Sequence, residues 1–121
     1  MTTVSSDATN VVVVQGQLSG PPRRRALPSG SVLVELDVTT RGESGSASVP
    51  VAWFDPGSLA DAVHEGDSVV VVGHVRRRFF RAAAITQSRT EVVAAQVLRA
   101  SRKAQVARLL AEVAAVLGAS P

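Results

Sequence analysis

The strongest constraint on the fold comes from residues 68–81, which run Ser-Val-Val-Val-Val-Gly-His-Val-Arg-Arg-Arg-Phe-Phe-Arg. Valine is branched at Cβ and favours extended backbone, so four consecutive valines predict a strand buried in a sheet. The second half of the segment places four arginines around two phenylalanines, although the whole chain has only three Phe, one Trp and no Tyr. Guanidinium groups pair with phosphates and rings stack on bases, so this half is typical of a platform for single-stranded nucleic acid.

The composition indicates one folded domain without cysteine chemistry. A chain of 121 residues that is 45% hydrophobic, mostly through valine and alanine, is large enough for one core and favours strands. The absence of cysteine excludes disulfides, thiolate metal sites and cysteine nucleophiles. Residues 1–10 show no signal-peptide pattern and no apolar run could span a bilayer, so we expect a cytoplasmic protein without membrane association. The net charge is only +3, but positive charge is clustered at residues 23–25 and 76–78.

Hydrophobic patterning predicts five strands and two helices. Apolar and polar side chains alternate from Val32 to Val38, for example, which predicts a strand with one face in water. The predicted strands cover residues 11–18, 31–39, 47–54, 68–81 and 91–98. A short helix is expected over residues 58–64 and a second from residue 101 to about 117, with Ser58 and Ser101 as N-caps and Gly118 as the stop. Residues 23–27 and 41–46 are expected to be loops.

This order of elements favours an all-β protein, a five-stranded OB-fold Greek-key barrel with a short helix between strands 3 and 4 and a C-terminal α-helix. Strand number alone leaves other small barrels open. We expect residues 1–9 to form a flexible N-terminal arm and residues 10–100 to form the OB-fold domain. Residues 101–121 would form a C-terminal amphipathic helix and tail.

The C-terminal helix is predicted to carry one apolar face, because its apolar residues recur at helical spacing. They are Val106, Leu109, Leu110, Val113, Val116 and Leu117. The stripe covers about two heptads, too few for a stable free coiled coil. It could dock on the chain's own barrel, pair with a second subunit or enter a partner's groove, and we favour docking within an oligomer.

Strand periodicity divides the basic and aromatic residues into two faces. His74, Arg76, Arg78 and Phe80 share one face, and Val75, Arg77 and Phe79 share the other. We predict that Arg76 and Arg78 contact phosphates and that Phe80 stacks on a base. Phe79 is expected in the core unless a bulge exchanges the faces. The alternative is a charged strand edge with both rings packed inside.

The remaining candidate residues are assigned by the same logic. Trp53 and Phe54 are adjacent and point in opposite directions, and we expect Trp53 to be buried. Arg23, Arg24 and Arg25 have two interpretations, phosphate contact or a mobile solvated charge run. Arg41 and Arg89 are single charges whose default assignment is solvation.

No catalytic, metal or cofactor site is expected. His64 and His74 have no second ligand at metal spacing. A nucleophile elbow, a phosphate-binding loop and a carboxylate pair in apolar surroundings are all missing from the sequence. The sequence therefore predicts a binding protein and not an enzyme.

Six short segments, in order and spacing, resemble bacterial single-stranded DNA-binding proteins from about residue 10 to residue 98. They are Asn-Val-Val-Val-Val-Gln-Gly-Gln-Leu at 10–18, Pro-Ser-Gly at 28–30, Val-Ala-Trp-Phe at 51–54, Leu-Ala-Asp-Ala-Val at 59–63, Gly-Asp-Ser-Val-Val-Val-Val-Gly-His-Val-Arg at 66–76 and Thr-Glu-Val-Val at 90–93. The resemblance implies an OB-fold that forms a homo-oligomer, usually a tetramer. It also implies binding of single-stranded DNA with little sequence preference, in replication, repair or recombination, at the nucleoid in the cytoplasm.

The resemblance also assigns roles to individual residues. Phe54 and Phe80 match positions where the family has stacking aromatics. Arg76 and Arg78 match basic residues on the same strand, and Arg25 matches a basic residue before the Pro-Ser-Gly turn. We include Arg23, in the same basic run, among the predicted nucleic-acid contacts.

Two departures from the family pattern motivate an alternative. Ser44 and Ser48 stand where the best-known members often have aromatic residues, and residues 118–121 lack the acidic, hydrophobic tip that recruits repair enzymes. The chain could therefore be a degenerate OB-fold interaction protein with weak or no DNA binding. It would then modulate a replication or repair assembly through its C-terminal helix. In either case the expected partner or subunit interface is Val106, Leu109, Leu110, Val113 and Leu117.

Overall fold

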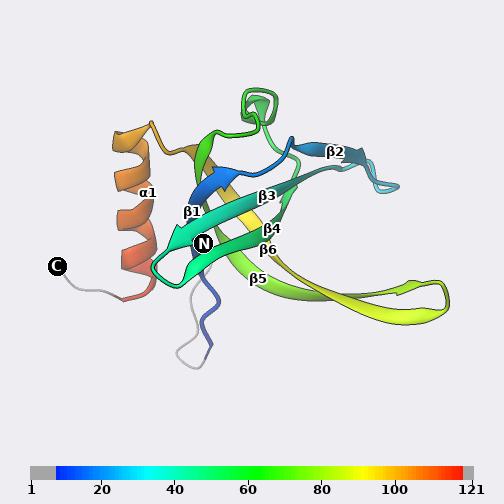
Figure 1. Cartoon of the computed structure of the whole chain (residues 1–121). Coiled ribbons are helices and arrows are strands. Elements are labelled where there is room, and N and C mark those ends of the chain that lie inside the picture. Colours follow the sequence, from blue (N-terminus) through cyan, green and yellow to red (C-terminus); the bar gives the residue numbers. More distant parts are fainter. Residues whose placement is uncertain (1–7, 119–121) are drawn as a thin grey trace.

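The computed structural model describes residues 8–118, which form six strands, a short 3₁₀ helix and one α-helix (Figure 1). The strands are β1 (Val12–Leu18), β2 (Arg23–Ala26), β3 (Val32–Gly42), β4 (Gly45–Phe54), β5 (Ser68–Ala82) and β6 (Ile85–Arg99). The helices are η1 (Ser58–Asp61), between β4 and β5, and α1 (Lys103–Val116) at the C-terminal end. Most of the predicted arm and the last three residues of the predicted tail lie outside the described residues.

Five strands close into a barrel in the order β1–β5–β6–β4–β3. The barrel closes because Gln17 and Leu18 of β1 pair with Thr39 and Val38 of β3. All pairings are antiparallel except that of β4 with β6, which is parallel. This closed mixed barrel, with a helical turn between its third and fourth strands, is the OB-fold and confirms the predicted fold class.

Alternating side chains fill the barrel. On β3 the buried residues include Val34, Leu36 and Val38, which confirms the predicted apolar face. Trp53 packs in the same core with 7% of its surface exposed, as predicted. Its neighbour Phe54 points to the outside and is half-buried. β4 is therefore fixed by the core on its inner side and presents the ring of Phe54 on its outer side.

The basic segment predicted as a loop is a strand. β2 pairs with the edge of β3, with Arg23 opposite Glu35 and Arg25 opposite Leu33. Three consecutive arginines carry no apolar alternation, so hydrophobic patterning does not predict this strand. It is held by backbone pairing to β3 and by ion pairs to acids on neighbouring elements.

Both long hairpins extend further than predicted. β3 and β4 continue through the expected loop to Gly42 and Gly45, and β6 begins at Ile85, six residues before the predicted start. The β5–β6 hairpin turns at Ala83 and Ala84, which both have positive φ. In Figure 1 this hairpin projects far beyond the barrel, on the side away from α1.

The helix starts differ from the predictions. The residue that precedes η1 is Gly57 and the one that precedes α1 is Arg102, and neither makes a side-chain capping bond. Ser58 and Ser101 are therefore not N-caps. Gly118 does end α1 as predicted, since its φ of 76° turns the chain and its N–H donates to the carbonyl of Ala115.

The α1 helix packs on β6 through a narrow contact. Leu109 is buried, with 4% of its surface exposed, and Val106 and Val113 are half-buried. Leu110, Val116 and Leu117 remain exposed. Docking on the chain's own barrel therefore uses only part of the predicted stripe. In the part of the chain that the structure describes, no helix is long and apolar enough to cross a membrane.

Candidate nucleic-acid interface

The outer face of the barrel gathers the predicted residues of β4 and β5. Arg76, Arg78 and Phe80 alternate on one side of β5, and Phe54 ends β4 on the same side. The guanidinium carbon of Arg76 lies 5.4 Å from the centre of the Phe54 ring. That of Arg78 lies 5.4 Å from the centre of the Phe80 ring. Each ring is thus in cation–π contact with one arginine, and charge and ring alternate along the face.

A buried glutamate joins these arginines. Glu91 of β6 has only 4% of its surface exposed and lies opposite Arg76 in the β5–β6 register. Its Oε2 accepts a 2.9 Å hydrogen bond from Nε of Arg76, and Nη2 of Arg76 lies 2.8 Å from the same oxygen in an ion pair. The Nε of Arg78 lies 3.5 Å from the same oxygen, and the Nε of Arg89 lies 3.7 Å from Oε1. Three cations around one anion leave a local charge of about +2.

The two looser arginines of this cluster are incompletely paired. Within the described residues, the buried Nε atoms of Arg78 and Arg89 find no hydrogen-bond partner. Their distances to Glu91 allow attraction but exceed an ordinary hydrogen bond. Each of these two side chains is nevertheless 37% exposed, so part of each arginine is open to an anion from solvent. Hydrophobic patterning and the resemblance did not predict the roles of Glu91 and Arg89, which depend on the hairpin register.

The predicted residues of β2 lie on the same outer face. Arg25 pairs with Leu33 of β3, and Leu33 pairs with Phe54 of β4. Directly paired residues on neighbouring strands share a face. Strands are about 4.8 Å apart, so the backbones of Arg25 and Phe54 are separated by about 10 Å. Arg23 lies two residues before Arg25 on this face, so all six predicted contacts belong to one surface.

The arginines of β2 form ion pairs with acids of the protein. Nη1 of Arg23 lies 2.8 Å from Asp37, Nη2 of Arg25 lies 3.9 Å from Glu35, and Arg24 points elsewhere to Asp61. The hydrogen bond to Asp37 raises the pKa of Arg23, against an opposing effect of burial. Exposed pairs of this kind contribute only about 0–1 kcal/mol, so a phosphate can compete for either arginine.

Phe79 lies on the opposite face of the β5–β6 hairpin, and its predicted position in the core is wrong. This ring is not in the core, since 65% of its surface is exposed. Strand periodicity assigned it to the inner side correctly, but the hairpin has left the barrel at this point and has no interior. Arg77 stacks on the ring at 5.4 Å and donates a hydrogen bond to Ser88 Oγ at 3.1 Å.

Ser44 and Ser48, which the resemblance aligns with aromatic positions, do not belong to this cluster. Ser44 is at the tip of the β3–β4 hairpin, and Ser48 pairs with Thr39 further along β4. Both are exposed. The aromatic part of the outer face therefore consists of Phe54 on β4 and Phe80 on β5.

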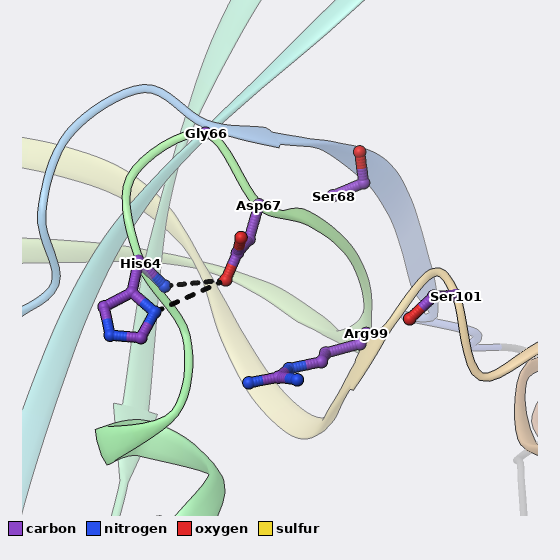
Figure 2. A pocket seen from close by; sticks show the side chains of 6 residues that line it. All are labelled: His64, Gly66, Asp67, Ser68, Arg99 and Ser101. Atoms are coloured by element: carbon purple, nitrogen blue, oxygen red, sulfur yellow. Dashed lines mark hydrogen bonds and ion pairs between the residues drawn. The ribbon is translucent and has the colours of Figure 1, made fainter.

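A separate hollow of about 490 Å³ lies where the turn before β5, the start of β5 and the end of β6 meet (Figure 2). It is lined by His64, Gly66, Asp67, Ser68, Arg99 and Ser101. Asp67 accepts a 2.9 Å hydrogen bond from the backbone N–H of His64, and Arg99 donates to the carbonyl of Ala62. Arg99 is ten residues beyond Arg89 on β6, or about 30 Å, so the hollow is separate from the outer face. Among residues 8–118, no three His, Asp or Glu side chains come together as metal ligands would.

The comparisons with known proteins establish the class of fold. No family model matches the sequence, and no curated protein matches it. The structure is similar to a crystal structure of a deletion mutant of the single-stranded DNA-binding protein from Thermus aquaticus, with a TM-score of 0.63 and 23% sequence identity. The match covers 75% of this chain and 40% of that chain, so it extends over less than half of the Thermus protein. At this identity the likeness shows a shared OB-fold barrel.

Proposed function

We propose that this chain binds single-stranded DNA with little sequence preference on the outer face of its barrel. The observation that carries the proposal is the cluster of three arginines and two rings on β4, β5 and β6, with Glu91 at its centre. Phosphates would contact Arg76, Arg78 and Arg89, and bases would stack on Phe54 and Phe80. Arg25 and Arg23 would extend the track of positive charge across β2.

The chemistry of the face supports a single strand as the ligand. Rings can stack only on bases whose faces are free, and such bases occur in single strands. Stacking and phosphate pairing both tolerate any base, so little sequence preference is expected. The structural likeness to a single-stranded DNA-binding protein points to the same class of ligand. Replication, repair or recombination would be the setting, in the cytoplasm at the nucleoid.

Salt should weaken this binding steeply. If about three to five arginines each neutralise one phosphate, the logarithm of the binding constant should fall against the logarithm of salt with a slope of about −2 to −3.5. Fluorescence anisotropy of a labelled oligo(dT), titrated at several salt concentrations, measures this slope. The absence of saturable binding at low salt would overturn the proposed function. Equal binding of double-stranded DNA would overturn the assignment of stacking.

A second proposed role, in self-association or partner binding, rests on the exposed part of α1. Leu110, Val116 and Leu117 leave apolar surface on a helix that is held to the barrel mainly by Leu109. An oligomer that buries this surface is the form we propose for the protein. The alternative function, an interaction protein that acts on a replication or repair assembly, would use the same surface.

Introducing charge into this surface should reduce the oligomer mass. We expect Leu110→Glu with Leu117→Glu to lower the mass measured by light scattering, because two carboxylates would be buried unpaired in the interface. Ala111→Glu with Ala115→Glu is the matched control, since both alanines are exposed on the opposite side of the helix. An unchanged mass would contradict the assigned interface. If neither the wild type nor the variant binds DNA, while the wild type alone retains a repair-protein partner, the alternative function is the correct one.

A further inference from the structure

The outer half of the β5–β6 hairpin has two faces open to solvent. β6 pairs with β4 only at Val92 and Val93, so residues 85–90 pair with β5 alone. Val92 is also the last core residue on this side of β6. Beyond it the hairpin is a two-stranded ribbon, visible in Figure 1 as the long extension at the right. Residues on both sides of this ribbon are therefore available to a ligand.

The side of the ribbon that faces away from Arg76, Arg78 and Phe80 has a defined composition. The register places Arg77 opposite Thr90, Phe79 opposite Ser88, and Arg81 opposite Thr86. We call these six residues the second face. All six are exposed, and none is acidic. They supply two cations, one ring and three hydroxyl groups, the groups that bind phosphates and bases.

The second face repeats the chemistry of the first. On the first face Arg78 stacks on Phe80, and on the second Arg77 stacks on Phe79, both with 5.4 Å between guanidinium carbon and ring centre. The two Arg-x-Phe pairs are one residue apart on the same strand, so they point to opposite sides of the ribbon. Phe79 is the more exposed of the two rings, with 65% of its surface in solvent. An apolar ring so exposed beside two cations suits a partner that is both aromatic and anionic.

We propose that one single strand of DNA passes around the β5–β6 hairpin and contacts both of its faces. This inference rests on the proposed function and extends its site from the first face to the second. The strand would place bases on Phe80 and Phe79 in turn, and its phosphates would pass the arginines at positions 76 to 81. An acidic protein partner on the second face is the competing occupant. The repetition of the Arg-x-Phe pair favours the nucleic acid.

The test compares Phe79→Ala with Ile85→Ala on oligonucleotides of two lengths. Ile85 is the control for the loss of an exposed apolar side chain at the same hairpin tip, because it is 62% exposed and lies opposite Ala82, on the side of Phe80 and not of Phe79. A short oligo(dT) of about six nucleotides should occupy the first face, whereas one of about 30 exceeds the roughly 4–16 nucleotides bound by one OB-fold. Phe79→Ala should weaken binding of the long oligonucleotide by about fivefold or more and leave the short one within about twofold. Ile85→Ala, on the other side of the hairpin, should not weaken the long oligonucleotide more than the short one.

Several outcomes would overturn the inference. The first is equal affinity of Phe79→Ala and wild type for the long oligonucleotide. The second is that Ile85→Ala weakens binding of the long oligonucleotide as much as Phe79→Ala does. The third is a lower oligomer mass of Phe79→Ala by light scattering, which would assign the ring to a protein contact. The two proposals can fail separately. If the wild-type chain binds neither oligonucleotide, the proposed function fails. If wild-type binding is lost in Phe80→Ala but unchanged in Phe79→Ala, only the second face is wrong.

Discussion

Replacing Glu91 with glutamine is expected to weaken binding of single-stranded DNA about tenfold, although the variant carries one more positive charge than the wild-type chain. Glu91 is buried and contacts three arginines at once. Its carboxylate is the common partner that offsets their mutual repulsion and holds them on one face. A neutral amide cannot supply the charge-assisted hydrogen bonds, so the guanidinium groups should separate and lose their alignment with Phe54 and Phe80.

Two opposite effects make this variant informative. If the arginines act only through the positive field of the face, removing an anion should tighten DNA binding. If they act through their arrangement, the loss of order should outweigh the gain in charge. We expect the second result, because side chains that must be ordered on binding lower the affinity by roughly 0.5–1.5 kcal/mol each.

The control is Glu65→Gln, which changes the net charge by the same amount. Glu65 is exposed in the turn between η1 and β5, away from the arginine cluster. This variant should bind as the wild type does or slightly more tightly. Anisotropy titrations at matched salt measure both affinities, and tighter binding by Glu91→Gln would contradict the positioning role.

Thermal unfolding should also separate Glu91→Gln from its control. We expect the free energy of unfolding to fall by about 2 kcal/mol for Glu91→Gln and to stay the same for Glu65→Gln. The loss is smaller than the roughly 3–5 kcal/mol of a fully buried pair, because each arginine keeps more than a third of its side chain exposed. If Glu91→Gln is still folded at the assay temperature, its weaker DNA binding comes from the changed interface and not from unfolding.

The barrel was predictable because its signal is local. Runs of consecutive valines mark β1 and β5 as buried strands, alternating apolar residues identify the buried side of β3, and the position of η1 selects the OB topology from other small barrels. β2 was missed because its strand character comes from its neighbour. Arg23 and Arg25 have no apolar pattern, and their extended backbone depends on the free edge of β3 and on the acids there.

The candidate site was predictable only in part, because periodicity assigns residues to a face but not to an environment. Periodicity correctly placed Phe79 and Phe80 on opposite faces of β5. Phe79 is nevertheless exposed, because the hairpin has already left the barrel at this position. The role of Glu91 could not be predicted without the hairpin register, which places it opposite Arg76. That register depends on a two-residue turn at Ala83 and Ala84, with φ values of 52° and 67°, where sequence rules expect Asn or Gly.

Removing both rings of the outer face should have the largest effect on DNA binding. Phe54→Ala with Phe80→Ala is expected to reduce the binding free energy by about 2–6 kcal/mol, at about 1–3 kcal/mol for each stacked base. The loss should persist at low salt, where phosphate contacts are strongest, because stacking does not depend on counterion release. The slope of affinity against salt should change little, since the arginines remain.

The leucine pair, Phe54→Leu with Phe80→Leu, distinguishes stacking from packing. Leucine keeps apolar volume next to Arg76 and Arg78 but has no ring face, so binding should fall nearly as far as in the alanine pair while stability is better preserved. Anisotropy of a labelled oligonucleotide is the suitable signal, because the single tryptophan, Trp53, is buried in the core. If the leucine pair binds as the wild type does, the rings act as apolar packing and the bases do not stack on them.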